Sequence, residues 1–382
     1  MGLFESNRPN KLTTSRFLVP TFYSKFKCKG SDCRNTCCHG WTVTVSQKEY
    51  FVLHGVSTNK TLRDKIDRAF IPFTNPTSSR YAEIRHNYDG DCPLLAKNGF
   101  CSLHSSLGEK VLPSVCRYYP RGPRNTYGYE STVTNSCEKT LELLFEDTSP
   151  ISFEEKDLSF EMVLPNKREN QDEINLYQLT KNQCFRILSN RLYSLPHRIH
   201  MVGILLQKLD LKESINLEEI YATSFQGLLT LDSIQTMIEI SKWFIDRNSS
   251  LSDYFETILK EYHDQDPLAY YQVKQRNFHQ NLVDHEVMYE KMLINNLYFR
   301  QFPFQEYTIN FNEEYISLVA KYMMIRFLGV HLYDGEKLEN FVDVMAKSFR
   351  VIAHTKFEKT MIQLLKQLHA DSQEALANGL ML

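Results

Sequence analysis

The chain has 382 residues, 42% of them hydrophobic and 12% aromatic, with a formal net charge of −2. The apolar fraction excludes a disordered chain, and the length exceeds what one hydrophobic core usually fills, so two domains are expected. The near-neutral total hides an asymmetry, because residues 1–137 carry 19 Lys and Arg against 10 Asp and Glu (+9), whereas the remainder carries 25 against 36 (−11).

The start of the chain carries no recognisable export or membrane signal. Residues 1–20 lack the continuous apolar stretch of a secretory signal, and no later apolar run approaches the roughly 20 residues that cross a bilayer. We therefore expect a soluble, cytoplasmic protein with no membrane partner. Met1, Gly2 and Ser6 fit a myristoylation pattern, which short N-terminal sequences often match by chance.

Cysteine dominates the N-terminal part of the sequence. Eight of the nine cysteines lie within the first 137 residues: Cys28, Cys33, Cys37, Cys38, Cys92, Cys101, Cys116 and Cys137. A reducing compartment disfavours structural disulfides, and neighbours such as Cys37 and Cys38 are poorly placed to bond with each other. Dense thiols of this kind indicate metal binding. All eight are therefore candidate ligands, with a preferred core of Cys33, Cys37, Cys38 and Cys116.

The spacing leaves the number and kind of metal sites open. Eight thiols can form two four-ligand sites or one site with spare thiols. Structural zinc sites usually use paired C-x2-C knuckles, which the sequence lacks, whereas iron–sulfur clusters tolerate less regular spacing. An iron–sulfur cluster is therefore favoured over zinc. His104, three residues after Cys101, is either a further ligand or a packing residue.

The pattern of the chain predicts an α+β protein. Alternating residues at 41–45 and 127–134 predict short strands in a small, loop-rich, metal-binding cysteine module, in which metal substitutes for core. We assign this module to residues 1–141. Residues 142–172, which are acidic and rich in turn formers, predict a linker, and residues 173–382 predict a mainly α-helical domain with a possible role in substrate binding.

Three apolar stripes at helical spacing support the helical domain. Their residues are Leu176, Leu179, Ile187, Leu188 and Leu192; Leu282, Val283, Val287, Met292, Leu293 and Leu297; and Phe341, Val344, Met345, Phe349 and Ile352. Such stripes form helix cores far more often than cofactor sites. Cys184 lies on the first stripe, and we expect it to be buried in the core.

The basic charge of the cysteine module is compatible with several roles. It can attract phosphate, carboxylate or nucleic acid, lower the pKa of thiols, or dock on the acidic helical part. Lys and Arg are dispersed through residues 1–137 without a concentrated run, so we expect no nucleic-acid partner.

Several motifs together resemble a known family. They are FKC at 26–28, the C-x4-C-x3-C-C block at 28–38, Gly40-Trp41, CPLL at 92–95, CSLH at 101–104, CRYYPR at 116–121 and the segment Asn295–Phe304. In this order they resemble the flagellin lysine-N-methylase family, a branch of the zinc- or iron-chelating cysteine-cluster domains. The resemblance covers roughly residues 20–137 and one patch beyond them.

The resemblance implies a protein-lysine N-methyltransferase. Such an enzyme would transfer a methyl group from S-adenosylmethionine to lysines of flagellin, with a 4Fe-4S cluster bound by the cysteines. Two common donor signatures are absent from the sequence, namely a strand followed by a Gly-x-Gly loop and the radical-enzyme C-x3-C-x2-C triad. A neutral lysine amine needs only in-line approach to the methyl group and removal of a proton, so a radical is unnecessary.

Residues beside Cys116 are the candidate site groups. Tyr118 and Tyr119 are candidate catalytic proton acceptors, although packing around the metal is the simpler role for each. Arg117 and Arg121 can pair with the donor's carboxylate or hydrogen-bond to cluster sulfurs. A cluster held by three cysteines would leave one iron open to chelate the donor's amino acid group.

A competing interpretation is a non-enzymatic protein, in which the cysteines bind zinc or iron and the helical domain binds a partner. In the methylase interpretation, the acidic helical part, including Glu313 and Glu314, would attract flagellin lysines. Acidic helix faces are more commonly only solvated. Methyl transfer to flagellin distinguishes the two interpretations.

Overall fold

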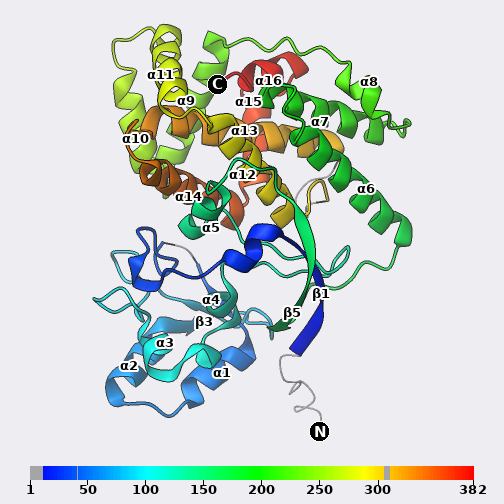
Figure 1. The fold of residues 1–382 in the computed structure, drawn as a ribbon. Helices are drawn as coiled ribbons and strands as arrows, with labels where there is room; N and C mark the ends of the chain where they lie inside the picture. The colour runs from blue at the N-terminus through cyan, green and yellow to red at the C-terminus, as the bar shows by residue number, and fades with distance from the viewer. Residues whose placement is uncertain (1–11, 41, 305–309) are drawn as a thin grey trace.

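The computed structural model describes residues 12–40, 42–304 and 310–382. Figure 1 shows two parts, an N-terminal module in blue and cyan and a larger helical part coloured from green to red. A two-stranded ribbon, β1 (Leu12–Pro20) and β5 (Phe153–Glu161), runs along one side of the boundary between them. The predicted myristoylation residues and Trp41 of the first predicted strand lie outside the described residues.

The N-terminal module combines short helices with a small sheet. Its elements are η1 (Thr21–Lys25), η2 (Gly30–Asp32), β2 (Thr44–Val45), α1 (Gln47–Gly55), α2 (Lys60–Ala69), β3 (Phe70–Pro72), β4 (Ala82–Ile84), α3 (Ser102–Leu107), η3 (Glu109–Val111) and α4 (Ser114–Tyr118). The strands form an antiparallel sheet in the order β2-β4-β3. Ser46 and Glu49 start α1 with a capping box, which satisfies backbone donors that a helix end leaves open.

This module has a hydrophobic core of its own. Its buried members are Val43, Val45, Leu53, Leu62, Ile66, Ala69, Phe70, Ala82, Ile84, Cys92, Leu94 and Leu103. The first predicted strand, at 41–45, forms only over Thr44–Val45. The second, at 127–134, is wrong: it contains isolated bridges at Glu130 and Val133, because its polar side chains bond to the helical part instead of aligning with a neighbouring strand.

The start of the chain is built into the helical part. β1 pairs with β5 over nine residues, from Leu12 opposite Glu161 to Pro20 opposite Phe153. β5 lies within residues 142–172, the segment that the sequence suggested as a linker. Phe17, which is fully buried, packs in the large core together with residues of the C-terminal helices.

The remaining elements are helices, so helix predominates within the predicted α+β class. They are α5 (Glu138–Leu144), α6 (Gln171–Leu188), α7 (Leu195–Asp210), α8 (Leu217–Tyr221), α9 (Leu231–Asp246), α10 (Ser252–Glu261), α11 (Pro267–Asn281), α12 (His285–Arg300), α13 (Phe311–Leu332), α14 (Leu338–His354), α15 (Phe357–Gln367) and α16 (Gln373–Gly379). Figure 1 shows α13 among the other helices, with α7 and α14 near it.

α13 is the central helix of the large core. Its residues from Glu314 to His331 are all buried. The helix is long and apolar enough to cross a membrane, which the sequence analysis did not expect of any segment, but 94% of its apolar window is buried inside the molecule. A helix that is apolar on all sides is the natural centre of such a core.

The predicted apolar stripes are confirmed in most positions. Every residue of the third stripe is buried on α14, and Cys184 is buried on α6. Leu192 and Val283 are exposed, because Leu192 follows the end of α6 and Val283 precedes the start of α12. Leu179 is also exposed, on the outer face of α6.

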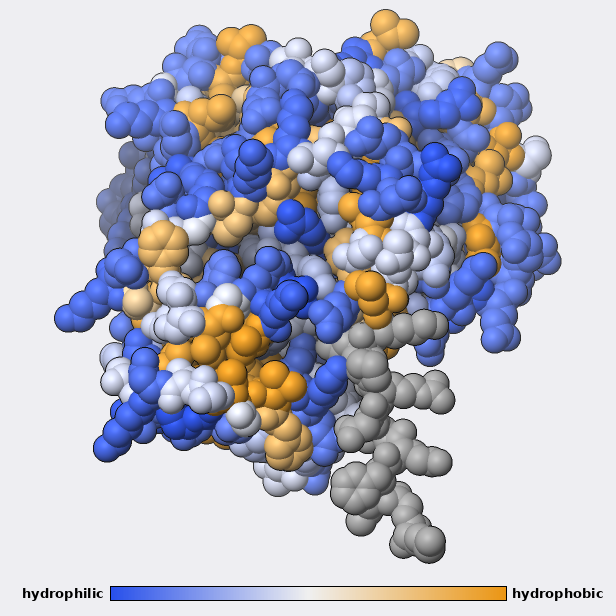
Figure 2. Space-filling view, turned by 60° about the horizontal axis from the view of Figure 1, so that its bottom comes forward, coloured by the Kyte–Doolittle hydropathy of each residue, from blue (hydrophilic) through white to orange (hydrophobic). Residues whose placement is uncertain are grey.

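The N-terminal module leaves several large apolar side chains exposed. Figure 2 shows an apolar patch on the lower face of the molecule, which this view brings forward. Exposed large apolar residues of the module are Phe51, Val52, Ile71, Tyr88 and Phe100. Most of the surrounding surface in this view is hydrophilic.

Replacing Gly329 on α13 by alanine tests the packing of the large core. The added Cβ would collide with the Tyr289 hydroxyl and lie 3.1 Å from the Phe341 ring. Overpacking costs about 1–3 kcal/mol, which outweighs the roughly 1 kcal/mol gained in helix propensity. We expect a loss of about 1 kcal/mol in the free energy of unfolding, measured with urea. Gly55→Ala, on α1, is the control, because its Cβ would meet nothing within 4 Å.

Candidate functional site

Four of the eight N-terminal cysteines form an inner thiol set, which we define as Cys38, Cys92, Cys101 and Cys116. The backbone N–H of Cys92 donates to the Cys38 carbonyl at 2.8 Å, and Cys101 forms a β-bridge with Leu95, three residues after Cys92. Cys116 lies on α4. Each of the four thiols is close enough to the other three for their charges to interact.

Burial raises the pKa of three of these thiols, whereas hydrogen bonding lowers the pKa of the fourth. Desolvation raises the pKa of Cys92 to about 12 and raises those of Cys101 and Cys116. Cys38 is the exception, because a hydrogen bond with the Cys37 thiol lowers its pKa to about 7. Cys38 is therefore the thiol of this set that ionises most readily, and bound metal would favour the thiolate form of the others.

The other four cysteines form an outer thiol set, Cys28, Cys33, Cys37 and Cys137. The charge of Cys28 acts on each of the other three, and that of Cys137 acts on Cys33. The backbone N–H of Gly30 donates to the Cys28 sulfur at 3.4 Å. This set joins a loop near the start of the chain to the N-terminal end of α5.

The carboxylate of Glu138, next to Cys137, holds this loop in place. It is fully buried and accepts hydrogen bonds from the Lys29 ammonium at 2.7 Å and from the backbone N–H groups of Arg34 and Asn35 at 3.2 and 2.7 Å. Burial alone would raise the pKa of Glu138, but these donors outweigh it and lower that pKa. A charged carboxylate therefore fixes the segment between Cys28 and Cys37.

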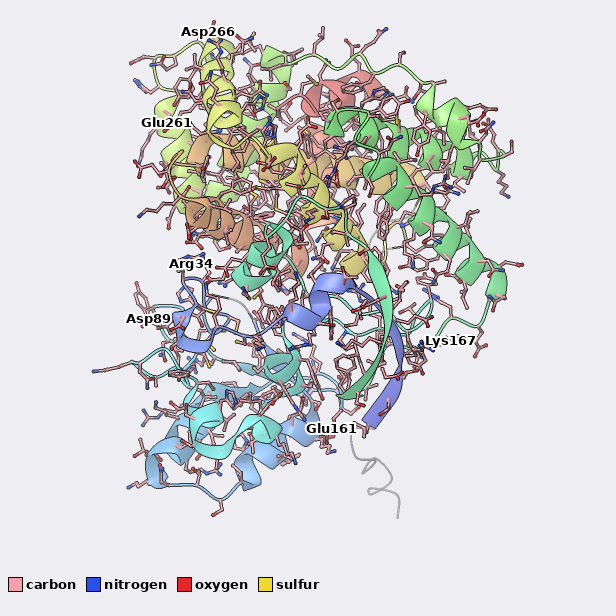
Figure 3. All side chains as sticks on the ribbon, viewed as in Figure 1. Arg34, Asp89, Glu161, Lys167, Glu261 and Asp266 are labelled. Atoms are coloured by element: carbon pink, nitrogen blue, oxygen red, sulfur yellow. The ribbon has the colours of Figure 1, made fainter. Side chains whose placement is uncertain are left out.

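The same loop also contacts the helical part. The Arg34 guanidinium donates to Asp343 of α14 at 3.0 Å, and Figure 3 labels Arg34 at the boundary between the two parts. The Arg350 guanidinium, also on α14, donates to the carbonyls of Asn35 and Ser136. The outer thiol set therefore lies at the junction, whereas Cys38, Cys92 and Cys101 of the inner set lie in or against the small core.

The donor chemistry of both sets suits a metal group. Among residues 12–40, 42–304 and 310–382, no three His, Cys, Asp or Glu side chains already converge on the position of a single ion. Four thiolates around an iron–sulfur cluster are held farther apart than four around one zinc ion, since the cluster itself occupies the centre. The four thiols of the inner set are mutually close, and four thiolates can bind either an iron–sulfur cluster or a zinc ion.

The structure divides the preferred ligand core between the two sets. Cys33 and Cys37 belong to the outer set, and Cys38 and Cys116 to the inner set, although Cys37 also contacts Cys38. Which thiols bind metal stays a prediction. The backbone N–H of His104 donates a hydrogen bond to the Cys101 sulfur.

The predicted site residues beside Cys116 point in different directions. The Tyr118 hydroxyl accepts a hydrogen bond from the backbone N–H of Glu161 at 2.7 Å, and Arg117 forms an ion pair with the Glu161 carboxylate at 2.9 Å. Figure 3 places Glu161 at the end of β5. These two side chains therefore hold the ribbon against the module.

Tyr119 and Arg121 face other surroundings. The Tyr119 hydroxyl shares a hydrogen bond of 3.0 Å with the Ser136 hydroxyl. Desolvation is the main cause that raises the pKa of Tyr119, and the charge of Cys137 adds to it. The Arg121 guanidinium lies over the rings of Phe26 and Tyr23, 5.0 and 5.9 Å from their centroids. Of the four predicted residues, Tyr119 is the one that contacts the junction between module and helices.

A buried polar segment, residues 130–138, forms the junction itself. Its Thr132 hydroxyl donates to the side chain of Asn295 on α12 at 2.6 Å, and the Asn295 amide donates to the Val133 carbonyl at 2.8 Å. The Asn135 amide donates to the Met292 carbonyl at 2.8 Å. The sequence analysis missed this contact, although both the polar run after Gly128 and the Asn295–Phe304 motif were visible in it.

Three side chains form a hydrogen-bonded path across the junction. The Ser136 hydroxyl bonds with Tyr119 on one side and with Nε2 of His354, at the end of α14, on the other, both at 3.0 Å. Desolvation, together with the charges of Arg350 and Arg300, lowers the pKa of His354 to about 4. His354 is thus neutral at pH 7 and is exposed, so the path leads from the cysteines to solvent.

A buried charged cluster lies beside the motif on α12. The ammonium of Lys321 is 3.2 Å from the carboxylate of Glu358, and the Arg300 guanidinium donates to the same carboxylate at 3.3 Å. Lys321 and Glu358 are fully buried, and desolvation lowers the pKa of Lys321. Glu314 is 1% exposed in the same cluster, so it does not belong to an acidic surface.

Asn296 adds an unusual feature to this cluster. It lies one helical turn before Arg300, and therefore on the same face of α12. Its side chain is 1% exposed, and within the described part of the chain neither of its amide atoms has a hydrogen-bond partner. Buried amides without partners are rare, and a bound polar ligand or water is the usual reason.

Replacing Glu138 by alanine tests the clamp on the outer thiol set. Three donors would lose their acceptor, so we expect a loss of about 3 kcal/mol in the free energy of unfolding at pH 7. Because the pKa of Glu138 is lowered from its usual 4.5, this difference should shrink as the pH falls below about 4.5. Urea unfolding at several pH values measures it. Glu142→Ala, which removes a more exposed partner of Lys29, should cost less than about 1 kcal/mol; equal losses would contradict the clamp.

Comparison with known families gives one clear match. Residues 181–379 match the family model described as the FliB lysine N-methylase C-terminal domain, which covers just over half of the chain. No solved structure matches.

Individual relatives agree with this match. The chain is 27% identical over 251 residues to the lysine-N-methylase of Salmonella typhimurium strain LT2, covering 63% of this chain and 61% of that protein. It is 26% identical over 251 residues to the lysine-N-methylase of Salmonella choleraesuis, with the same coverage. It is 29% identical over 143 residues to the flagellar biosynthetic protein FliU of Salmonella muenchen, covering 36% of this chain and 81% of that protein. The chain thus spans about three fifths of the length of the two lysine-N-methylases.

Proposed function

This chain belongs to the FliB lysine N-methylase family, and we propose that it is itself a protein-lysine N-methyltransferase that uses S-adenosylmethionine. The observation that carries the proposal is the path Tyr119, Ser136 and His354, which connects a buried polar junction to solvent. Methylation of an amine must release a proton, and this path can carry one away from a site that excludes bulk water.

The reaction requires little beyond positioning and proton removal. The donor supplies an electrophilic methyl group. The lone pair of the neutral lysine nitrogen forms the new C–N bond as the C–S bond breaks, and the resulting methylammonium then loses one of its two protons. A lysine amine has an ordinary pKa of about 10.4, so a neutral amine is scarce at pH 7 unless the site lowers that pKa. Burial beside the cations Arg300 and Arg350 would have this effect.

Tyr119 is the residue that we propose to meet the substrate amine. Its hydroxyl can accept the proton as it passes its own to Ser136, and Ser136 can pass one to the neutral Nε2 of His354. The protonated His354 loses that proton readily, because its pKa is lowered to about 4. Tyr118, the other candidate, is held by the backbone of Glu161 away from this path.

The charged cluster on α12, α13 and α15 is our candidate for the donor's amino acid group. A zwitterion needs cationic and anionic partners together, and Arg300, Lys321 and Glu358 provide both in one buried place. The Asn296 amide can form the hydrogen bonds that such a ligand does not make with the three charged side chains. Arg121 stays a proposed partner of the donor, whereas the ion pair of Arg117 with Glu161 makes Arg117 less available.

For the metal group, we propose that the inner thiol set binds a 4Fe-4S cluster. Its four mutually close thiols support a metal centre here, and the lack of paired C-x2-C knuckles in the sequence favours a cluster over a zinc site. When bound, the cluster would supply thiolate-linked iron that fixes four segments of the module together. A cluster held by only three of these thiols would instead leave one iron open to bind the donor's amino acid group, as an alternative to the charged cluster.

The substrate that we propose is flagellin, encountered in the cytoplasm. The name of the FliU relative places it in flagellar biosynthesis, which supports this choice. The acidic helical part would favour approach of lysine-rich surfaces. Glu313, whose side chain is 14% exposed and paired to Lys366, would contribute little to this attraction.

Transfer of labelled methyl groups tests the proposal. The protein, purified without oxygen, would be mixed with recombinant flagellin and methyl-labelled S-adenosylmethionine, and the lysines would be analysed by mass spectrometry. We expect methyl-lysine on flagellin that depends on both components. Fully metal-loaded protein that binds flagellin without methylating it would instead establish the non-enzymatic interpretation.

Replacing Tyr119 by phenylalanine tests the proton path. We expect kcat for methyl transfer to fall by about 10–100-fold, with a smaller fall at high pH, where solution base substitutes for the path. Tyr118→Phe is the matched control, because its hydroxyl only accepts from the Glu161 backbone, and we expect less than a two-fold change. Equal rates for both variants would remove Tyr119 from the mechanism.

A further inference from the structure

We propose that the chain carries two separate thiolate-bound metal centres, the second of them held by the outer thiol set of Cys28, Cys33, Cys37 and Cys137 at the junction with the helical part. The first is the centre assigned above to the inner set. The inference does not depend on methyl transfer, since it concerns only how the eight thiols are divided.

Backbone contacts assign the two sets to different scaffolds. The inner set is fixed by the pairing of Cys92 with Cys38 and of Cys101 with Leu95, next to the three-stranded sheet. The outer set is fixed by Glu138, which binds the loop at Lys29, Arg34 and Asn35. Neither scaffold includes residues of the other set.

Packing gives the same division. Cys92 belongs to the small core, and Cys38 and Cys101 pack against it, whereas Cys137 packs against the large core of the helical part. A single centre using thiols of both sets would therefore have to connect two hydrophobic cores. Two centres let each set bind where its own core holds it.

The neighbouring pair Cys37 and Cys38 marks the boundary between the centres. Two consecutive cysteines are an unusual arrangement for ligands of one small ion, but one ligand for each of two adjacent centres is simple to build. Cys37 interacts with Cys28 of the outer set and also with Cys116 of the inner set, whereas Cys38 interacts with Cys92 and Cys101 of its own set. The thiols of Cys37 and Cys38 are hydrogen-bonded, so the two centres would be close neighbours.

Charges of both signs face the outer set. The Lys29 ammonium, adjacent to Cys28, favours the Cys33 thiolate, whereas the Glu138 carboxylate disfavours it more strongly. The guanidinium of Arg350 reaches the carbonyl of Asn35, between Cys33 and Cys37. Soft thiolate ligands of this number select zinc or an iron–sulfur cluster. Thiolates bind both of these groups, and the measurement of iron, sulfide and zinc described below distinguishes them.

Metal analysis of paired variants tests the division. Wild type and the variants Cys28→Ala/Cys137→Ala and Cys92→Ala/Cys101→Ala would be purified without oxygen, and iron, acid-labile sulfide and zinc per chain would be measured. We expect each double variant to lose the metal of its own thiol set and to keep the metal of the other set. Loss of zinc alone from the outer-set variant identifies a zinc site, and loss of about four iron with four sulfide identifies a second cluster.

Two results would overturn the proposal: the outer-set variant keeping all of the wild-type metal, or both variants losing the same portion. Cys184→Ala is the control, because Cys184 is buried on α6 in the large core and should leave the metal content unchanged. Methyl transfer by the same samples is a separate readout, so failure of the proposed activity and failure of the second centre are distinguishable.

A measurement on the wild-type protein covers the case of a variant that does not fold. Thiol alkylation followed by mass spectrometry would compare metal-loaded and chelator-treated protein. With two centres, all eight N-terminal thiols should be protected at least ten-fold until the metal is removed. If the exposed Cys28 and its three partners react equally fast in both samples, the outer set binds no metal.

Discussion

The burial of a polar segment between two hydrophobic cores is the constraint on which this structure depends. Residues 130–138 are almost entirely polar and almost entirely buried, so each donor and acceptor needs a partner with defined geometry. Asn295 supplies partners from α12, and the Glu138 carboxylate supplies them to the cysteine loop. Because hydrogen bonds are directional, these contacts fix how the module sits on the helices more strictly than apolar packing alone would.

This constraint also places the chemistry. The same junction is bordered by the outer thiols, the Tyr119 path and the charged cluster around Lys321. These groups come from segments that are far apart in the sequence. Buried charges are costly unless they are paired, and groups with strongly shifted pKa values cluster at functional sites as well as in structural ion pairs. A site at this junction would be shielded from bulk water, which strengthens every electrostatic interaction within it.

The sequence predicted those features of the fold that depend on residue type and local periodicity. The cysteine-rich module, the helical C-terminal part and the burial of Cys184 follow from residue type and periodicity. The pairing of β1 with β5 did not, because about 140 residues separate the partners and neither strand alternates clearly. The roles of Ser136, Glu138 and Lys321 were equally hidden, since their importance arises from neighbours contributed by other elements.

The pairing of β1 with β5 has a consequence for how the chain is made. Residues 12–20 are synthesised long before Leu365, yet Phe17 and Leu365 belong to the same hydrophobic core. This segment can pair with β5 once residues 153–161 have been made, but it lacks its partners in the C-terminal helices until those have been synthesised. During that interval its apolar side chains are open to chaperones, whereas the small core of residues 43–103 can close on its own.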